Sequence, residues 1–218
     1  MPPIAMLVDA QGHWDYDIYY RSGLKMGRQI VGWINEFLPD RAIRYLESGC
    51  GPARFLRHLP KLTEGKHTFH GSDYNGATIE WCAQNFPDVT FVKNELEPPL
   101  PFDDNAFDFV FSRSVFTHLT EANGLKWMQE LQRVTAPGGV ICFSTGGDGY
   151  KHKLSEEELK RYEAGEPIAK LRDAEGQKLF SIKHPPSWVR DNFLQGMELL
   201  RFIPGEFNQD IWIARVAG

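Results

Sequence analysis

The 218-residue sequence has few cysteines, no long apolar run and no excess of basic residues. Its three cysteines are scattered, and none forms the C-x-x-C pair of a zinc or dithiol site, which favours a reducing, cytoplasmic setting. No apolar run approaches the roughly 20 residues that cross a bilayer, and the start of the chain lacks the basic region of a signal peptide. We therefore expect neither secretion nor a membrane span. The histidines lack metal-ligand spacing, so no metal site is expected.

Acidic residues outnumber basic ones, with 29 Asp and Glu against 24 Lys and Arg and a formal net charge of -5. A protein that binds the phosphates of nucleic acid needs a basic surface, so nucleic acid is not an expected partner. Hydrophobic residues make up 42% and charged residues 24%, as in globular proteins. The composition predicts one compact domain, as a monomer or a homodimer.

Apolar runs of strand length alternate with segments of helical period, which is typical of βα units around a mainly parallel sheet. One helix is expected over residues 19–38 and another over residues 121–135. Strands are expected at residues 42–48, 68–73, 89–92, 106–112 and 140–145, and a closing antiparallel pair at residues 199–203 and 211–216, which turns around Pro204 and Gly205.

The chain divides into four parts by this pattern. Residues 1–40 are expected to form an N-terminal helical lid, whose aromatic stretch at residues 13–23 folds over a ligand, and residues 41–146 a ligand-binding core. Residues 147–184, called the insertion below, are charged and rich in turns, and we expect them to form a substrate cap. Residues 185–218 are expected to supply a helix and the strand pair that completes the sheet.

A glycine-rich turn follows the first expected strand and carries the most information about function. Glu47 precedes Gly49 and Gly51 at the point where the strand must turn into a helix. Glycines let the backbone approach a ligand, and the start of a helix offers unpaired amide groups. The turn therefore predicts a nucleotide-like ligand.

The residues around this turn argue against a dinucleotide and for a cationic nucleoside. The dinucleotide fingerprint needs a small residue where Arg54 stands. Glu47 suits an amino or sulfonium group, because a carboxylate attracts a cation and repels a pyrophosphate. Asp73 ends the second expected strand, where a carboxylate can accept both hydroxyls of a ribose. Together these features describe adenosine attached to a cationic amino acid.

At this point the sequence resembles the class I S-adenosylmethionine-dependent methyltransferases, from Arg44 to about Thr145. Four ordered motifs carry the resemblance: residues 47–53, the strand end at Asp73, residues 100–108 and residues 133–139. The resemblance implies an α/β Rossmann-like sandwich with a seven-stranded, mostly parallel sheet whose last strand is antiparallel. It also implies S-adenosyl-L-methionine as the cofactor and a small molecule as the methyl acceptor.

Carried over by position, the family pattern implies a set of cofactor-binding residues. It places the methionine end at the glycine turn, the ribose at Asp73 and the adenine beside Tyr74. The full set is Glu47, Gly49, Cys50, Gly51, Asp73, Tyr74, Asn94, Glu95, Leu96 and Ser112. The chain departs from the family at Ser48, usually an apolar residue, and at Ala53, usually glycine. Alanine suits the turn only if the backbone there does not need a positive φ.

Candidates for the acceptor side follow the fourth and fifth strands, because open α/β sheets bind ligands at the carboxyl ends of their strands. His118 is a candidate base and Arg113 a candidate partner for an acid, although each is equally suited to a structural role. The candidate substrate residues are Tyr19, Tyr20, Asp148, Tyr150 and His184.

The sequence leads to a methyltransferase that modifies oxygen or nitrogen of a small molecule. One alternative is a protein of the same fold that binds the cofactor without transferring its methyl group, which Ser48 and Ala53 would suit. A second is a nicotinamide-dependent enzyme, which Arg54 disfavours.

Overall fold

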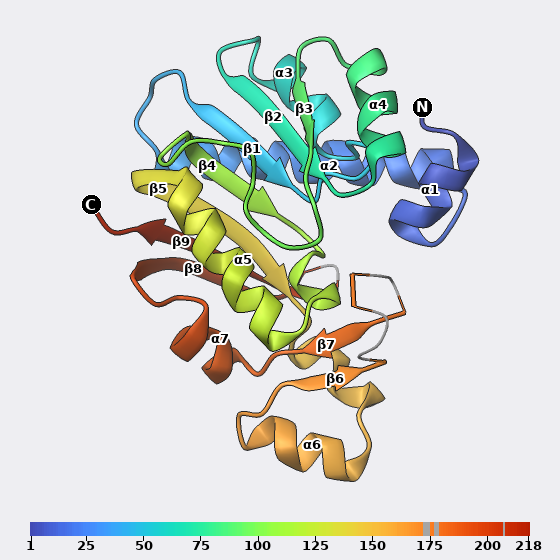
Figure 1. Cartoon of the computed structure of the whole chain (residues 1–218), viewed down its shortest axis with the longest axis vertical. Helices are drawn as coiled ribbons and strands as arrows, with labels where there is room; N and C mark the ends of the chain where they lie inside the picture. The colour runs from blue at the N-terminus through green and yellow to red at the C-terminus, as the bar shows by residue number, and fades with distance from the viewer. Residues whose placement is uncertain (172–174, 177–178, 207) are drawn as a thin grey trace.

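The computed structural model describes residues 1–171, 175–176, 179–206 and 208–218. Seven strands form one sheet in the order β3-β2-β1-β4-β5-β9-β8 (Figure 1). Strands β1 to β5 run parallel, and β9 lies antiparallel between β5 and β8. The strands are β1 (Arg44–Ser48), β2 (Thr68–Asp73), β3 (Thr90–Lys93), β4 (Phe107–Ser112), β5 (Thr135–Thr145), β8 (Met197–Glu206) and β9 (Gln209–Val216). This is the fold class that the sequence predicts, and it is confirmed.

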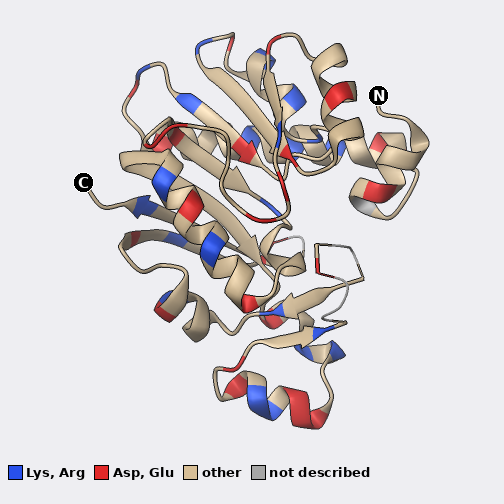
Figure 2. Ribbon diagram, viewed as in Figure 1, with Lys and Arg blue, Asp and Glu red and all other residues tan. Residues whose placement is uncertain are grey.

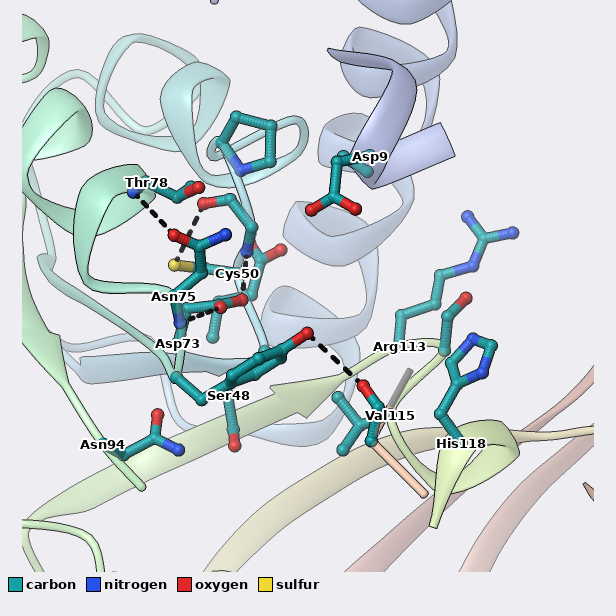
Figure 3. Close-up of a pocket in the computed structure, with 18 of the residues that line it drawn as sticks. Asp9, Ser48, Cys50, Asp73, Asn75, Thr78, Asn94, Arg113, Val115 and His118 are labelled. Atoms are coloured by element: carbon teal, nitrogen blue, oxygen red, sulfur yellow. Dashed lines mark hydrogen bonds between the residues drawn. The ribbon is translucent and has the colours of Figure 1, made fainter. Parts of the chain in front are cut away.

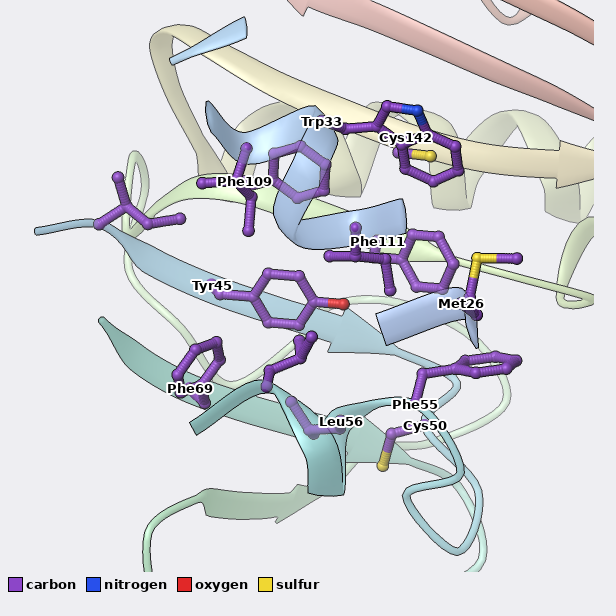
Figure 4. Packing of buried hydrophobic residues seen from close by; sticks show 14 of the residues in the cluster. Met26, Trp33, Tyr45, Cys50, Phe55, Leu56, Phe69, Phe109, Phe111 and Cys142 are labelled. Carbon is purple, nitrogen blue, oxygen red and sulfur yellow. The ribbon is translucent and has the colours of Figure 1, made fainter. Parts of the chain in front are cut away.

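Helices cover both faces of the sheet. One face carries α2 (Tyr16–Phe37), η1 (Leu56–His58), α3 (Leu59–Leu62) and α4 (Gly76–Asn85). The other carries α5 (Glu121–Val134) and α7 (Pro186–Asn192). In Figure 4, Met26 and Trp33 of α2 meet Tyr45 of β1 and Phe111 of β4 in the first of these two cores. The sandwich thereby fixes the carboxyl ends of β1, β2 and β4 side by side.

The remaining elements lie at the edges of this sandwich. The N-terminal helix α1 (Ile4–Gln11) precedes α2, and η2 (Phe116–His118) follows β4. The insertion holds η3 (Asp148–Lys153), α6 (Glu156–Glu163) and a separate two-stranded sheet of β6 (Ile168–Lys170) and β7 (Ser181–Lys183). Helix α6 begins at the predicted capping box, in which Ser155 and Glu158 exchange hydrogen bonds. None of the helices described is long and apolar enough to cross a membrane.

Two local predictions differ from the structure. The antiparallel pair does not turn at Pro204 and Gly205, because both residues belong to β8, where Gly205 has a φ of 68° and the register shifts. β8 is an edge strand, and edge strands accommodate proline and bulges. The aromatic stretch at residues 13–23 does not form a separate cover, since α2 begins at Tyr16 and buries Tyr19 fully.

Candidate functional site

A cavity of about 480 Å³ lies at the carboxyl ends of the central strands. Its walls come from the loops after β1, β2, β3 and β4, together with α1 and two residues of the insertion. Figure 3 shows Asp73 and Asn75 on one side of this cavity and Arg113 and His118 on the other. The site therefore has two ends with different chemistry.

The glycine loop after β1 presents its backbone to the cavity. Gly49 and Cys50 donate their backbone N–H groups to the Ser72 carbonyl oxygen over 2.8 and 2.9 Å, which ties the loop to β2. Gly49 has a φ of 75°, and a Cβ there would lie 2.2 Å from Val115. Only glycine fits this position, as the sequence led us to expect.

Asp73 links the end of β2 to the same loop. Its Oδ2 accepts the backbone N–H of Gly51 over 2.8 Å, and its Oδ1 accepts that of Asn75 over 2.9 Å. Burial raises the pKa of the Asp73 carboxyl, against the effect of these two N–H groups. Because each carboxylate oxygen accepts more than one hydrogen bond, Asp73 retains capacity for two ribose hydroxyls.

Glu47 faces the cavity with a buried oxygen that has no partner in the described part of the chain. The residue is 2% exposed, and its Oε2 makes no hydrogen bond. Burial raises the pKa of Glu47 to about 8, although Arg54 opposes the shift. A buried, unpartnered carboxylate oxygen is costly until a cation or donor reaches it. The residues present thus fit the ammonium and sulfonium groups of S-adenosylmethionine.

The backbone at Ala53 has a positive φ, although alanine suits this turn only where φ is negative. Ala53 has a φ of 57° and is fully buried. This is the left-handed region, where a side chain costs about 1 kcal/mol relative to glycine. The strain falls on the helix start behind the loop, since Ala53 does not line the cavity.

Most of the predicted cofactor residues come together here. Nine of the ten line the cavity: Glu47, Gly49, Cys50, Gly51, Asp73, Tyr74, Asn94, Glu95 and Leu96. Ser112 does not, because its side chain is 1% exposed and points into the protein interior. Tyr74 is 51% exposed and donates its hydroxyl to the Gly176 carbonyl oxygen over 3.3 Å, which brings the insertion to this side of the cavity.

Arg113 and His118 lie at the opposite end of the cavity. Burial and, to a smaller extent, the neighbouring Arg54 guanidinium lower the pKa of Arg113 to about 10. The Nδ1 of His118 lies 3.0 Å from the Phe180 carbonyl oxygen. A carbonyl oxygen only accepts, so Nδ1 carries the proton and Nε2 carries the lone pair. The contact therefore sets His118 in the tautomer that a base needs.

The five predicted substrate residues do not line this cavity. Tyr19 is fully buried and donates its hydroxyl to the Pro52 carbonyl oxygen over 2.8 Å, and the Tyr20 ring packs against His58. Asp148 pairs with Lys151. His184 is 1% exposed between the rings of Trp188 and Phe193, and burial lowers its pKa to about 3. Tyr150 lies among lysines of the insertion.

Helix α1 lines the cavity, although sequence reasoning did not select it. Met6, Asp9 and Ala10 face the glycine loop, and Leu7 is fully buried. The apolar run at residues 4–8 was the available signal. Of the residues 1–40 that we expected to form a lid, those of α1 line the cavity, and whether they act as a lid stays a prediction. Asn75, Thr78 and Trp127 are among the lining residues outside the predicted set.

We expect a chain that lacks residues 1–12 to fold and to bind S-adenosylhomocysteine about tenfold more weakly, because α1 covers one wall and the Asp15 cap of α2 is retained. Calorimetry on both chains measures this. Trp14→Ala is the control, since Trp14 is 74% exposed and lies outside the cavity. Equal affinity for the shortened and full chains would show that α1 is no lid.

Among the described residues, no group of three or more His, Cys, Asp or Glu gathers closely enough to hold a metal ion. The three cysteines are buried and unpaired with one another.

The comparisons with known proteins agree with the family that the sequence resembles. Residues 46–143 match the model of a methyltransferase domain. Malonyl-(acyl-carrier protein) O-methyltransferase of Erwinia pyrifoliae is 28% identical over 117 residues, which are 54% of this chain and 42% of that protein. The chain spans less than half the length of the curated relatives it matches.

Solved structures share the fold over nearly the whole chain. Magnesium protoporphyrin IX methyltransferase from Synechocystis PCC 6803, solved with bound S-adenosylhomocysteine, superposes with a TM-score of 0.65 at 14% identity over 95% of this chain and 90% of that one. A methyltransferase from Aquifex aeolicus gives 0.63 at 18% identity over the full length of both chains. Residues 46–143 therefore resemble a methyltransferase domain, and the chain has the fold of the class I S-adenosylmethionine-dependent methyltransferases.

Proposed function

We propose that this protein is an S-adenosylmethionine-dependent methyltransferase that modifies an oxygen or nitrogen atom of a small molecule. The observation that carries the proposal is one cavity with a cofactor end, at Glu47 and Asp73, and a second end at Arg113 and His118. A methyltransferase needs both ends, whereas a protein that only binds the cofactor needs the first alone.

The residues of the cofactor end hold and orient the ligand. Asp73 accepts the ribose hydroxyls, while the open backbone at Gly49 and Gly51 leaves room for the methionine end. Glu47 loses its proton as the cationic group arrives, and its unpartnered oxygen then gains an ionic partner. S-adenosylmethionine supplies the electrophilic methyl group on its sulfonium ion.

The residues of the second end act on the acceptor. His118 takes a proton from the attacking hydroxyl or amine at Nε2, because Nδ1–H is engaged by the Phe180 carbonyl oxygen. Arg113 attracts an acidic group of the acceptor or the methionine carboxylate. In-line transfer depends mostly on alignment, so these two residues add rate to a reaction that the cavity has already oriented.

We expect His118→Gln to lower kcat by about 100-fold or more, the usual scale for loss of a positioned base. The affinity for S-adenosylhomocysteine should not change. An acceptor is identified first, by incubating wild-type protein with S-adenosylmethionine tritiated in its methyl group and a panel of phenols, carboxylic acids and amines. The control is His152→Gln, because His152 is exposed and lies outside the cavity. An unchanged kcat and pH profile for His118→Gln would remove His118 from the chemistry.

Wild-type protein that binds the cofactor but transfers no methyl group to any class of acceptor would favour the binding-only alternative.

We further propose a cytoplasmic location, because the three cysteines are buried and unpaired with one another.

A further inference from the structure

Four lysines of the insertion lie on η3, β6 and β7, and two of them, Lys153 and Lys183, lie over the ring of Tyr150. Lys151 and Lys153 belong to η3, Lys170 to β6 and Lys183 to β7. In Figure 2, the blue basic residues on these elements lie near one another, whereas red acidic residues predominate on α6. The lysines therefore form a local basic cluster in a chain that is acidic overall.

Carboxylates neutralise two of the four. Lys151 Nζ lies 3.1 Å from Asp148 Oδ1, and Lys170 Nζ lies 3.1 Å from Glu158 Oε2. Within the described residues, neither Lys153 nor Lys183 has such an ion pair. Their ammonium groups lie 5.0 and 5.8 Å from the centre of the Tyr150 ring. The cluster thus retains two positive charges on one aromatic side chain.

Lys183 is the unusual member because it is a cation that is only 8% exposed. Its Nζ donates to Ser181 Oγ over 2.8 Å, which occupies one of three N–H donors. Burial lowers the pKa of Lys183, and Lys170 and Lys153 lower it further. Glu158 attracts this ammonium group but forms no direct ion pair with it. A buried ammonium group without a direct ion pair is costly, so this position is poorly explained by stability.

The cluster is close to the acceptor end of the main cavity. Lys183 follows Phe180 by three residues, and the Phe180 carbonyl oxygen is the group that binds His118. Three residues of extended chain span roughly 10 Å. Ser181 and Lys183 project from the same face of β7, since side chains alternate along a strand. Lys183 does not line the main cavity, so an acceptor that occupies both places must extend beyond His118 to reach it.

We propose that Lys183, Ser181 and Lys153, arranged around Tyr150, form a binding site for an oxyanion, the carboxylate or phosphate group of the methyl acceptor. The oxyanion would accept the remaining donors of Lys183 and neutralise both unpaired lysines. Its assignment to the acceptor rests on the proposed function, whereas the binding of an anion does not.

Thermal unfolding of the full chain at pH 7.5 tests the site, with chloride replaced by up to 20 mM phosphate or acetate at constant ionic strength. At tenfold saturation a bound anion adds about 1.4 kcal/mol, which raises Tm by roughly 3 °C for a chain of this size. We expect a saturable rise in wild-type protein. A response to phosphate alone indicates a phosphate ester, and a response to both indicates a carboxylate.

Lys183→Met should raise the basal Tm in chloride, because it removes the buried charge, and should abolish the anion response. Lys153→Met changes an exposed side chain and should weaken the response several-fold, which provides a second test if Lys183→Met fails to fold. Lys61→Met, on an exposed lysine of α3, is the control and should respond as wild type.

Two results would overturn the site. One is that neither anion raises the Tm of wild-type protein. The other is that Lys183→Met and Lys153→Met both respond to the anion as strongly as wild-type protein does. Non-specific salt effects appear in every variant and do not alter the difference between them. Calorimetry with S-adenosylhomocysteine on Lys183→Met separates the two proposals. Retained binding locates the defect at the anion site, and absent binding in wild-type protein contradicts the proposed function alone.

Discussion

Replacing Glu47 with glutamine should lower the affinity for S-adenosylmethionine and for S-adenosylhomocysteine by about 10- to 100-fold. This is the scale of one lost charge-assisted interaction, about 1.5–3 kcal/mol. Glutamine keeps the shape of the side chain but loses the charge that its buried Oε2 offers a cation. 5′-Methylthioadenosine, which has neither the amino group nor the sulfonium, should bind both proteins equally. Calorimetry with the three ligands gives the comparison.

The same residue predicts how affinity depends on pH. In the free protein Glu47 has a pKa raised to about 8, so it is mostly protonated below that pH. If the cation binds the ionised form, affinity for S-adenosylmethionine rises about tenfold or more between pH 6.5 and 8.5. Glu47→Gln should remove this dependence. A pH-dependent affinity that persists in the variant would assign the effect to another group.

The stability of the ligand-free protein should change with pH in the opposite direction. A carboxyl whose folded-state pKa is raised contributes stability that is present below pH 4.5 and is lost as the pH rises through 8. Glu47→Gln removes that loss, so the ligand-free variant should be more stable above pH 8 by about 2–4 kcal/mol. Denaturant unfolding at pH 6 and 9 measures it, with the exposed Glu80→Gln as control. A less stable variant at pH 9 would mean that Glu47 is ionised and paired in the free protein.

Replacing Asp73 with alanine should cost about 1.5–3 kcal/mol of S-adenosylhomocysteine binding, because the carboxylate is placed for both ribose hydroxyls. The carboxylate also holds the backbone N–H groups of Gly51 and Asn75, so part of the loss comes from the loop. A second ligand separates the two contributions.

That ligand is the 2′,3′-dideoxy form of 5′-methylthioadenosine, compared with the parent nucleoside. If Asp73 binds the ribose, removal of the hydroxyls should cost affinity in wild-type protein and little in Asp73→Ala. The exposed Asp88→Ala should behave as wild type. An equal loss on removal of the hydroxyls in both proteins, with the fold intact, would show that Asp73 serves the loop and does not contact the ribose.

The sequence predicts the core well because its motifs are local. Glu47 and Asp73 lie at the ends of β1 and β2, the glycines follow β1, and the parallel order of β1, β2 and β4 brings these ends to one edge. The exception is Ser112, in a strand that is buried on both faces. Ser112 ends β4 at the expected place, but its side chain lies on a buried face.

The acceptor side depends on contacts between distant segments and was less predictable. Strands β6 and β7 have three residues each, which is too short for alternation to reveal them. The contact between Phe180 and His118 spans 62 residues, and α1 lies over the cavity by tertiary packing. The positive φ at Ala53 could be suspected only from the glycine that the family usually has there, since alanine itself does not mark such a backbone.

Calorimetry of the full wild-type chain with S-adenosylmethionine, S-adenosylhomocysteine and NAD in parallel tests the central claim most directly. We expect one molecule of either sulfur ligand to bind per chain and NAD to give no saturable heat. Glu47 repels a pyrophosphate at the glycine turn, and Arg54 stands where the dinucleotide fingerprint needs a small residue. Saturable binding of NAD, or no binding of either sulfur ligand by folded protein, would contradict the account.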